Sequence, residues 1–221
     1  MTEELSEQIA ENRARAEMYR LLASVFFREL DESQIATLKA APLAAPEEGR
    51  MKRGSDAVYR AFRLAAPDVL TRLRVDYARI FLAAGVYEGD TAVPFESVFT
   101  GEEGILMDEA REQVVAIFRA EEVTVDPELQ SPEDHLSFEL EFMAILSDRI
   151  AEAWEREDEA EARRLMEMQA SFAQDHLLNW MPDLAERVSS FAKEPFYPAF
   201  MDYAIGFVED DESWLKDSLA Q

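Results

Sequence analysis

Apolar residues along the chain recur at the three- and four-residue spacing of amphipathic helices. Near the N-terminus, Met18, Leu21, Leu22, Val25 and Phe26 stand at i, i+3, i+4, i+7 and i+8, which places them on one helix face. Similar patterns, interrupted by short stretches rich in proline, glycine or charge, predict helices over most of the chain. We expect helices at 3–28, 32–40, 47–64, 67–83, 102–121, 183–192, 197–209 and 212–219, with two more between 131 and 180.

A long loop and a polar junction separate these predicted helices. Residues 85–99 have no helical period and contain Gly85, Gly89 and Pro94, so we expect an ordered loop there. Residues 122–134 form the junction, whose first part is too short and too acidic for a strand. With no repeat and no composition break, the chain 1–221 is predicted to be a single all-α domain, a bundle of about ten helices.

The end of the junction has the strongest helix-start signal in the sequence. Ser131 is a suitable N-cap, and Pro132 fits the first turn of a helix. Glu133 and Asp134 would then complement the positive end of the helix dipole. The helix that follows is apolar on most faces, which predicts a central and buried position.

The charge balance narrows the range of partners. The 221 residues include 47 Asp or Glu and 22 Lys or Arg, a formal net charge of −25. Phosphate recognition requires a basic surface, so we expect no nucleic-acid partner and no anionic membrane surface. A cationic partner would be attracted. The acidic N-terminus, and the lack of any apolar run near the ~20 residues of a membrane span, predict a cytoplasmic protein without membrane insertion.

Catalytic and metal chemistry find little support in the sequence. The chain has no cysteine and two histidines, His135 and His176, neither of which belongs to a Glu-x-x-His or His-Glu-x-x-His pattern. Phosphate-loop, dinucleotide and nucleophile-elbow motifs are also absent. We therefore expect no enzyme, no metal and no cofactor. A helical metal-binding or enzymatic bundle remains the alternative from another class, and a purely structural adaptor is a third interpretation.

Three segments look more specific than core packing requires, although each also has a simpler interpretation. Residues 77–82 and 93–99 form a proline-containing ledge that could merely anchor a loop. In residues 131–143, capping explains Asp134 but does not require His135 beside it, and Glu139 lies one turn later on the same face. The third segment runs from Phe172 through His176 to Pro182, and core packing alone would explain it.

Together, and in this order, these segments resemble the TorD/DmsD/NarJ family of redox-enzyme maturation chaperones. The resemblance extends from about residue 19 to residue 197. Its most specific parts are Tyr-x-x-Ile-Phe at 77–81, Pro-Phe-Glu-Ser-Val-Phe at 94–99 and Pro-Glu-Asp-His-Leu-x-x-Glu-Leu-x-Phe-Met at 132–143. Two departures are mild: Ser131 stands where members often have an acid, and Phe95 where they often have tyrosine.

The resemblance implies a TorD-like helical fold and a cytoplasmic chaperone without a catalytic cycle. Such a protein binds the twin-arginine signal peptide of a molybdopterin oxidoreductase and holds back the apo form until its molybdenum cofactor is inserted. A narrower alternative is a NarJ-like assembly chaperone for a membrane-bound nitrate reductase-type complex. Family members are monomers or dimers, domain-swapped in some cases. By position, Asp134 and His135 match the leader-binding pair, and Pro94 with its neighbours matches the adjoining ledge.

The side-chain chemistry is compatible with such a partner. Two arginines require carboxylates, and the apolar remainder of a leader requires a groove. We hypothesise that His135 orients Asp134 or bonds to the peptide backbone. The predicted signal-peptide-binding residues are Tyr77, Phe81, Pro94, Phe95, Glu96, Ser97, Phe99, Asp134, His135 and Glu139.

Overall fold

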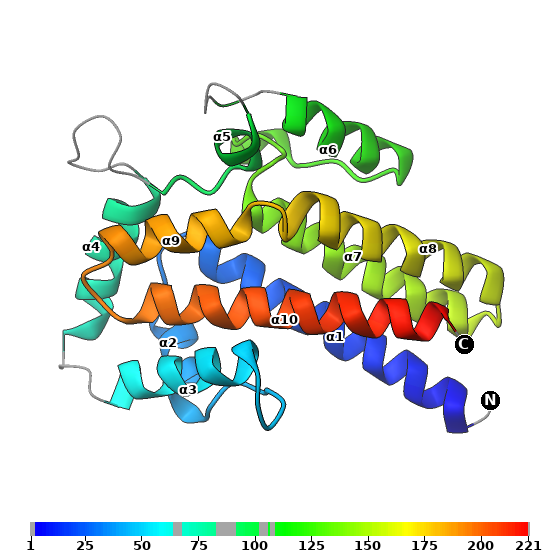
Figure 1. Ribbon diagram of the computed structural model, residues 1–221, viewed down its shortest axis with the longest axis horizontal. Coiled ribbons are helices and arrows are strands. Elements are labelled where there is room, and N and C mark those ends of the chain that lie inside the picture. Colours follow the sequence, from blue (N-terminus) through cyan, green and yellow to red (C-terminus); the bar gives the residue numbers. More distant parts are fainter. Residues whose placement is uncertain (1–2, 64–67, 83–91, 102–105, 107–108, 221) are drawn as a thin grey trace. The chain divides into compact units, whose positions relative to one another are not determined.

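The all-α fold class predicted from the sequence is confirmed by the structure, a computed structural model that describes residues 3–63, 68–82, 92–101, 106 and 109–220 (Figure 1). These residues form ten α-helices and no strand. No helix in these ranges is long and apolar enough to cross a membrane. The helices are α1 Glu3–Phe27, α2 Glu32–Ala40, α3 Arg50–Arg63, α4 Val69–Phe81, α5 Glu96–Thr100, α6 Glu109–Ala120, α7 Leu136–Glu155, α8 Glu159–Phe172, α9 Met181–Phe191 and α10 Phe196–Leu219, with a 3₁₀ turn η1 at Pro127–Leu129 and a π-helical turn η2 at Ala173–Leu177.

Several helix boundaries differ from those expected. The predicted loop 85–99 is only partly described, and a short helix, α5, occupies its end. The predicted break near residues 210–211 does not occur, because α10 continues through it and the carboxylate of Asp211 is bound by the side chains of Arg15 and Tyr19. The helix expected at 183–192 begins at Met181, and Pro182 stands in its first turn, where the missing N–H costs nothing.

The chain divides into two compact units, which we describe separately. Unit 1 comprises Met1–Phe27, Phe95–Asn179 and Asp211–Gln221, and unit 2 comprises Arg28–Pro94 and Trp180–Asp210. Each unit is therefore assembled from segments far apart in the sequence.

In unit 1, α7 is the central helix, as its apolar composition predicts. It packs along α1 and against α8, its neighbour after a short turn (Figure 1). Buried polar groups support this packing. Arg15 Nε donates to Asp211 Oδ1 at 2.5 Å, and one Nη of Arg15 donates to Gln169 Oε1, also at 2.5 Å. Gln169 in turn donates to the carbonyl of Met143 on α7 at 2.8 Å. These bonds link α1, α7, α8 and the end of α10.

In unit 2, two glycines allow α3 and α10 to approach closely. A Cβ atom added to Gly54 would lie 2.6 Å from the Cα of Tyr203, and one added to Gly206 would lie 2.7 Å from the Cα of Met51. Real side chains do not reach such distances, so the crossing depends on glycine at both positions.

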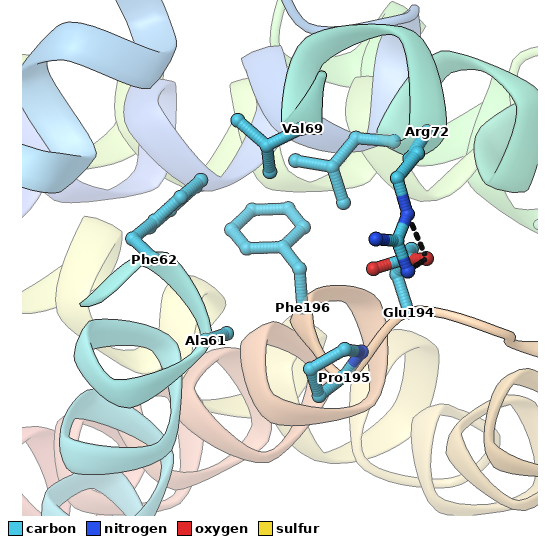
Figure 2. A pocket seen from close by; sticks show the side chains of 8 residues that line it. Ala61, Phe62, Val69, Arg72, Glu194, Pro195 and Phe196 are labelled. Atoms are coloured by element: carbon cyan, nitrogen blue, oxygen red, sulfur yellow. Dashed lines mark hydrogen bonds and ion pairs between the residues drawn. The ribbon is translucent and has the colours of Figure 1, made fainter. Parts of the chain in front are cut away.

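A small cavity of about 20 Å³ lies in unit 2 between α3, α4 and the start of α10. Figure 2 shows the ring of Phe196 pointing into this region, with Phe62 and Val69 beside it and the ion pair of Arg72 with Glu194 at one edge. The ring centroids of Phe62 and Phe196 are 5.2 Å apart. The cavity has room for little more than one water molecule, so it is a packing defect and not a ligand site.

Candidate functional site

Asp134 caps a helix, but not the one that the sequence predicted. The helix after the junction begins at Leu136, so Ser131 is not its N-cap and Pro132 is not in its first turn. Oδ2 of Asp134 instead accepts a hydrogen bond at 3.0 Å from the backbone N–H of Ser97, at the start of α5. The carbonyl of Asp134 accepts from the N–H of Glu96, also at 3.0 Å. Asp134 therefore joins two of the three most specific motifs of the sequence, those at 94–99 and 132–143.

The second carboxylate oxygen of Asp134 is enclosed and has no bonding partner among the described residues. Asp134 is fully buried, and Oδ1 has no hydrogen-bond partner among the described residues. The hydroxyls of Ser97 and Ser137, both buried, also lack a partner within the described ranges. Because buried polar atoms are almost always bonded, each of these three oxygens has an unused capacity to accept a hydrogen bond.

His135 is itself the N-cap of α7. This role accounts for the histidine at this position, which capping by Asp134 did not require. Its Nδ1 accepts a hydrogen bond at 3.1 Å from the backbone N–H of Ser137. Since Nδ1 is the acceptor, the proton of the neutral ring is assigned to Nε2. Burial lowers the pKa of His135 from 6.5 to about 4, so the imidazole is neutral at physiological pH.

An aromatic cluster surrounds this imidazole. The ring centroids of Phe95, Phe138 and Phe27 lie 4.9, 5.6 and 6.1 Å from that of His135. The backbones of Phe95 and His135 also form an isolated antiparallel bridge. No hydrogen bond links the ring to Asp134, whose free oxygen has no partner among the described residues. The imidazole therefore fixes backbone and aromatic positions and does not orient the carboxylate.

Glu96 has partners that the sequence did not reveal. Its Oε2 lies 3.0 Å from Nδ1 of His176, and its Oε1 accepts from Nδ2 of Asn179 at 3.2 Å. His176 lies in the π-helical turn η2, with its ring centroid 4.9 Å from that of Phe172. Such turns are rare and often mark functional sites. Of the third segment singled out in the sequence, His176 contacts the candidate site, but the pattern gave no indication of Asn179 or of the π turn.

Glu139 lies one turn into α7 and is fully buried. Its backbone N–H donates to the carbonyl of His135 at 3.2 Å. The i, i+4 spacing suggested a hydrogen bond between the two side chains. The bond that joins Glu139 and His135 is instead between backbone groups.

The ten predicted binding residues are distributed over both units. Seven of them lie in unit 1, where α5 and the start of α7 bring Phe95, Glu96, Ser97, Asp134 and His135 together, with Phe99 on α5 and Glu139 on α7. Tyr77, Phe81 and Pro94 belong to unit 2. There, Tyr77 and Phe81 are buried, with ring centroids 5.0 Å apart.

Metal chemistry gains no support from the geometry. Within the part of the chain that the structure describes, no three His, Asp or Glu side chains are grouped so that they could hold a metal ion. Asp134 instead offers a carboxylate that can accept hydrogen bonds beside an aromatic surface.

Comparison with known proteins agrees with this description. A family model described as "Nitrate reductase delta subunit" matches residues 48–186, a range that includes every predicted binding residue. A chaperone protein TorD of Vibrio cholerae (strain O395) is 32% identical over 217 residues, which cover 95% of this chain and 96% of the relative. TorD of a Psychrobacter species is 30% identical over 219 residues, or 94% of each chain. TorD of Vibrio parahaemolyticus is 29% identical over 218 residues, covering 96% and 99%. The chain therefore belongs to the TorD/NarJ family of redox-enzyme maturation chaperones.

Proposed function

We propose that this chaperone binds the twin-arginine signal peptide of a molybdopterin oxidoreductase. It would hold the apo form in the cytoplasm and assist cofactor insertion before export, as a binding protein without a catalytic step. The observation that carries the proposal is the free Oδ1 of Asp134, a buried carboxylate oxygen without a hydrogen-bond partner among the described residues. Membership of the family and the net charge of −25 support the same partner.

The guanidinium group of arginine suits this carboxylate. Oδ2 of Asp134 is occupied by the N–H of Ser97, so Oδ1 can accept one charge-assisted bond from an arginine N–H. The unpartnered hydroxyls of Ser97 and Ser137 could accept further N–H groups of the same planar fork. Guanidinium is more weakly hydrated than ammonium and enters an enclosed site at lower cost. We therefore expect the site to prefer arginine to lysine.

An aromatic surface beside Asp134 suits the apolar part of a leader. Phe27, Phe95 and Phe138 are half-buried around His135, and Phe99 lies half-buried one turn after Phe95. Side chains of this kind bury large areas on binding a hydrophobic peptide. The parts of Glu96, Glu139, Tyr77, Phe81 and Pro94 in peptide binding remain predictions from the sequence.

Calorimetry with a leader peptide tests the proposal. The peptide comes from the oxidoreductase encoded beside this chaperone, in three versions: with both arginines, with both replaced by lysine, and with both replaced by glutamine. We expect the first to bind tightest and the glutamine version to lose at least tenfold in affinity. Equal binding of all three peptides would exclude recognition of arginine by a carboxylate.

The variant Asp134→Asn localises the contact. The asparagine carbonyl can still accept from the Ser97 N–H, while its NH₂ group presents a donor where Oδ1 was an acceptor. We expect the native peptide to bind at least tenfold more weakly. The control Asp76→Asn changes another buried aspartate, whose oxygens bind the N–H groups of Lys193 and Glu194 in unit 2, and should leave affinity unchanged in the folded protein. Loss of binding in the control but not in Asp134→Asn would overturn the assignment.

A NarJ-like assembly chaperone is the second candidate, favoured by the nitrate reductase delta subunit model that matches the chain. Its client would be a reductase subunit without a twin-arginine leader. Capture of the client from cells in which the leader of the neighbouring oxidoreductase has been deleted separates the two. A client retained without its leader supports the NarJ-like role, and a client lost supports the first proposal.

A further inference from the structure

A second cavity lies in unit 1, away from the candidate site. It has a volume of about 180 Å³ and is lined by residues of α1, α7, α8 and α10. Trp154 lines it near the end of α7, 18 residues after Leu136, and a rise of 1.5 Å per residue places the two about 27 Å apart along the helix. A molecule in this cavity would therefore not contact Asp134 or His135.

The size and walls of the cavity suit a single aromatic ring. A cavity of about 150 Å³ is known to accommodate benzene, so one ring with a small substituent fits the space here. Two of the three tryptophans in the sequence, Trp154 and Trp214, line it. The guanidinium of Arg15 lies 4.5 Å from the ring centroid of Trp214 and covers one of its faces. What Trp214 presents to the cavity is thus its other face or its edge, and both contact aromatic rings favourably.

The polar groups that line the cavity include one cation, Arg163. One Nη of Arg163 donates to the carbonyl of Leu219 at 2.6 Å, and its guanidinium forms no ion pair with any described residue. Gln8 and Ser218 also line the cavity, and their side chains can both donate and accept hydrogen bonds. In this chain acids outnumber Lys and Arg by 47 to 22, so an arginine without a carboxylate partner is notable.

Glu159 limits the charge that the cavity accepts. It lines the same space one helical turn before Arg163. A ligand with a single negative charge can face Arg163 and avoid Glu159, whereas a phosphate monoester, with a charge of about −2 at pH 7, would be repelled more strongly. A carboxylate also matches the planar N–H fork of arginine.

From these contacts we infer that the cavity binds a small aromatic monocarboxylate, with the ring between Trp154 and Trp214 and the carboxylate on Arg163. This site is independent of leader recognition, because no residue of the two sites is shared. It would make the chaperone responsive to a small metabolite as well as to its client.

Binding of benzoate, followed through the tryptophan indole N–H signals in ¹H–¹⁵N spectra, tests the inference. Trp154 and Trp214 should shift as benzoate is added, while Trp180, buried in unit 2, serves as an internal control and should not. Benzamide has the same shape without the charge, and benzylamine reverses the charge. We expect each to bind at least fivefold more weakly than benzoate.

A pair of variants assigns the charge contact. Arg163→Gln should weaken benzoate binding at least tenfold, whereas Arg119→Gln, which removes the same charge from an exposed position on α6, should change it less than twofold. If Arg163→Gln does not fold, the comparison of benzoate with benzamide on the unaltered protein still tests whether the negative charge of the ligand contributes to binding. Absence of any indole shift at 10 mM benzoate, equal affinity for the three probes, or a shift of Trp180 alone would overturn the inference.

Discussion

The carboxylate of Glu96 lies 3.0 Å from Nδ1 of His176, although the two residues are 80 positions apart in the sequence. Both side chains are buried. The contact attaches the first residue of α5 to the π-helical turn that follows α8, while the backbone of Glu96 is held by Asp134. Glu96 thus connects the proline-containing motif to the other two segments.

Removal of the Glu96 side chain is expected to destabilise the protein. Glu96→Ala takes away the carboxylate that lies against the buried Nδ1 of His176, which should lower the free energy of unfolding by about 1–3 kcal/mol. Glu96→Gln keeps a side chain of the same shape, with an oxygen and an NH₂ group in place of the two oxygens. Its loss in the free energy of unfolding should be less than half as large. Urea unfolding measures both. As a control, Glu128→Ala changes an exposed acid and should stay within about 0.5 kcal/mol. Equal losses in Glu96→Ala and Glu128→Ala would contradict the structural role of Glu96.

The low pKa of His135 predicts that acid weakens the fold. Burial lowers the folded-state pKa to about 4 from 6.5. Between these values the unfolded chain binds a proton that the folded protein does not, so stability is retained above pH 6.5 and is lost as the pH falls toward 4. A difference of this size between the two pKa values corresponds to about 3 kcal/mol.

His135→Asn isolates this effect, because asparagine is a good N-cap and does not titrate. Unfolding free energies of both proteins, measured from pH 7 to pH 4, should diverge as the wild type loses about 3 kcal/mol more than the variant. In the wild type, the NMR signal of the His135 ring should titrate with a midpoint near 4. A midpoint near 6.5 would contradict the burial described here.

Asp134 should separate stability from binding. Because Asp134→Asn keeps the bond to the Ser97 N–H, its free energy of unfolding should remain within about 1 kcal/mol of the wild type even as leader affinity falls. Asp134→Ala loses that helix-capping bond and should cost a further ~1 kcal/mol. Thermal unfolding of both variants checks this order. If Asp134→Asn proves as unstable as Asp134→Ala, the residue acts mainly as a cap.

Gly54→Ala tests the close crossing of α3 and α10. The added methyl carbon would lie 2.6 Å from the Cα of Tyr203, so the helices would have to move apart. We expect a loss of about 1–3 kcal/mol in the free energy of unfolding, even though alanine has the higher helix propensity. An unchanged or higher melting temperature would show that the two helices are not so close.

Helical periodicity predicted most of the fold, because an apolar stripe is a local property. The first four helices appear close to their expected bounds, and α7 is central as its composition predicts. What local patterns missed depends on distant contacts. Asp134 caps a helix 37 positions earlier in the chain, whereas the pattern assigned it to the helix that follows. The break expected near Asp211 is absent, because Arg15 and Tyr19 bind its carboxylate from the far end of the sequence.

The sequence predicted which residues meet at the candidate site more successfully than it predicted what each of them does there. Glu96, Asp134 and His135 do meet through α5 and the start of α7. The sequence could not show that His135 is a helix cap, because imidazole is an unusual one. The π turn that places His176 beside Glu96 leaves no signature in a 3.6-residue period.

The pairing of α1 with α7 determines when this chaperone can itself fold. Arg13 on α1 and Asp148 on α7 form an ion pair across 135 positions of sequence. At a synthesis rate of about 5–20 residues per second, α7 leaves the ribosome roughly 7–27 s after the segment it must cover. During that interval the apolar stripe of α1 has no partner from its own unit. This member of a family of maturation chaperones is therefore itself an incompletely folded chain, with the apolar face of α1 exposed, until α7 has been synthesised.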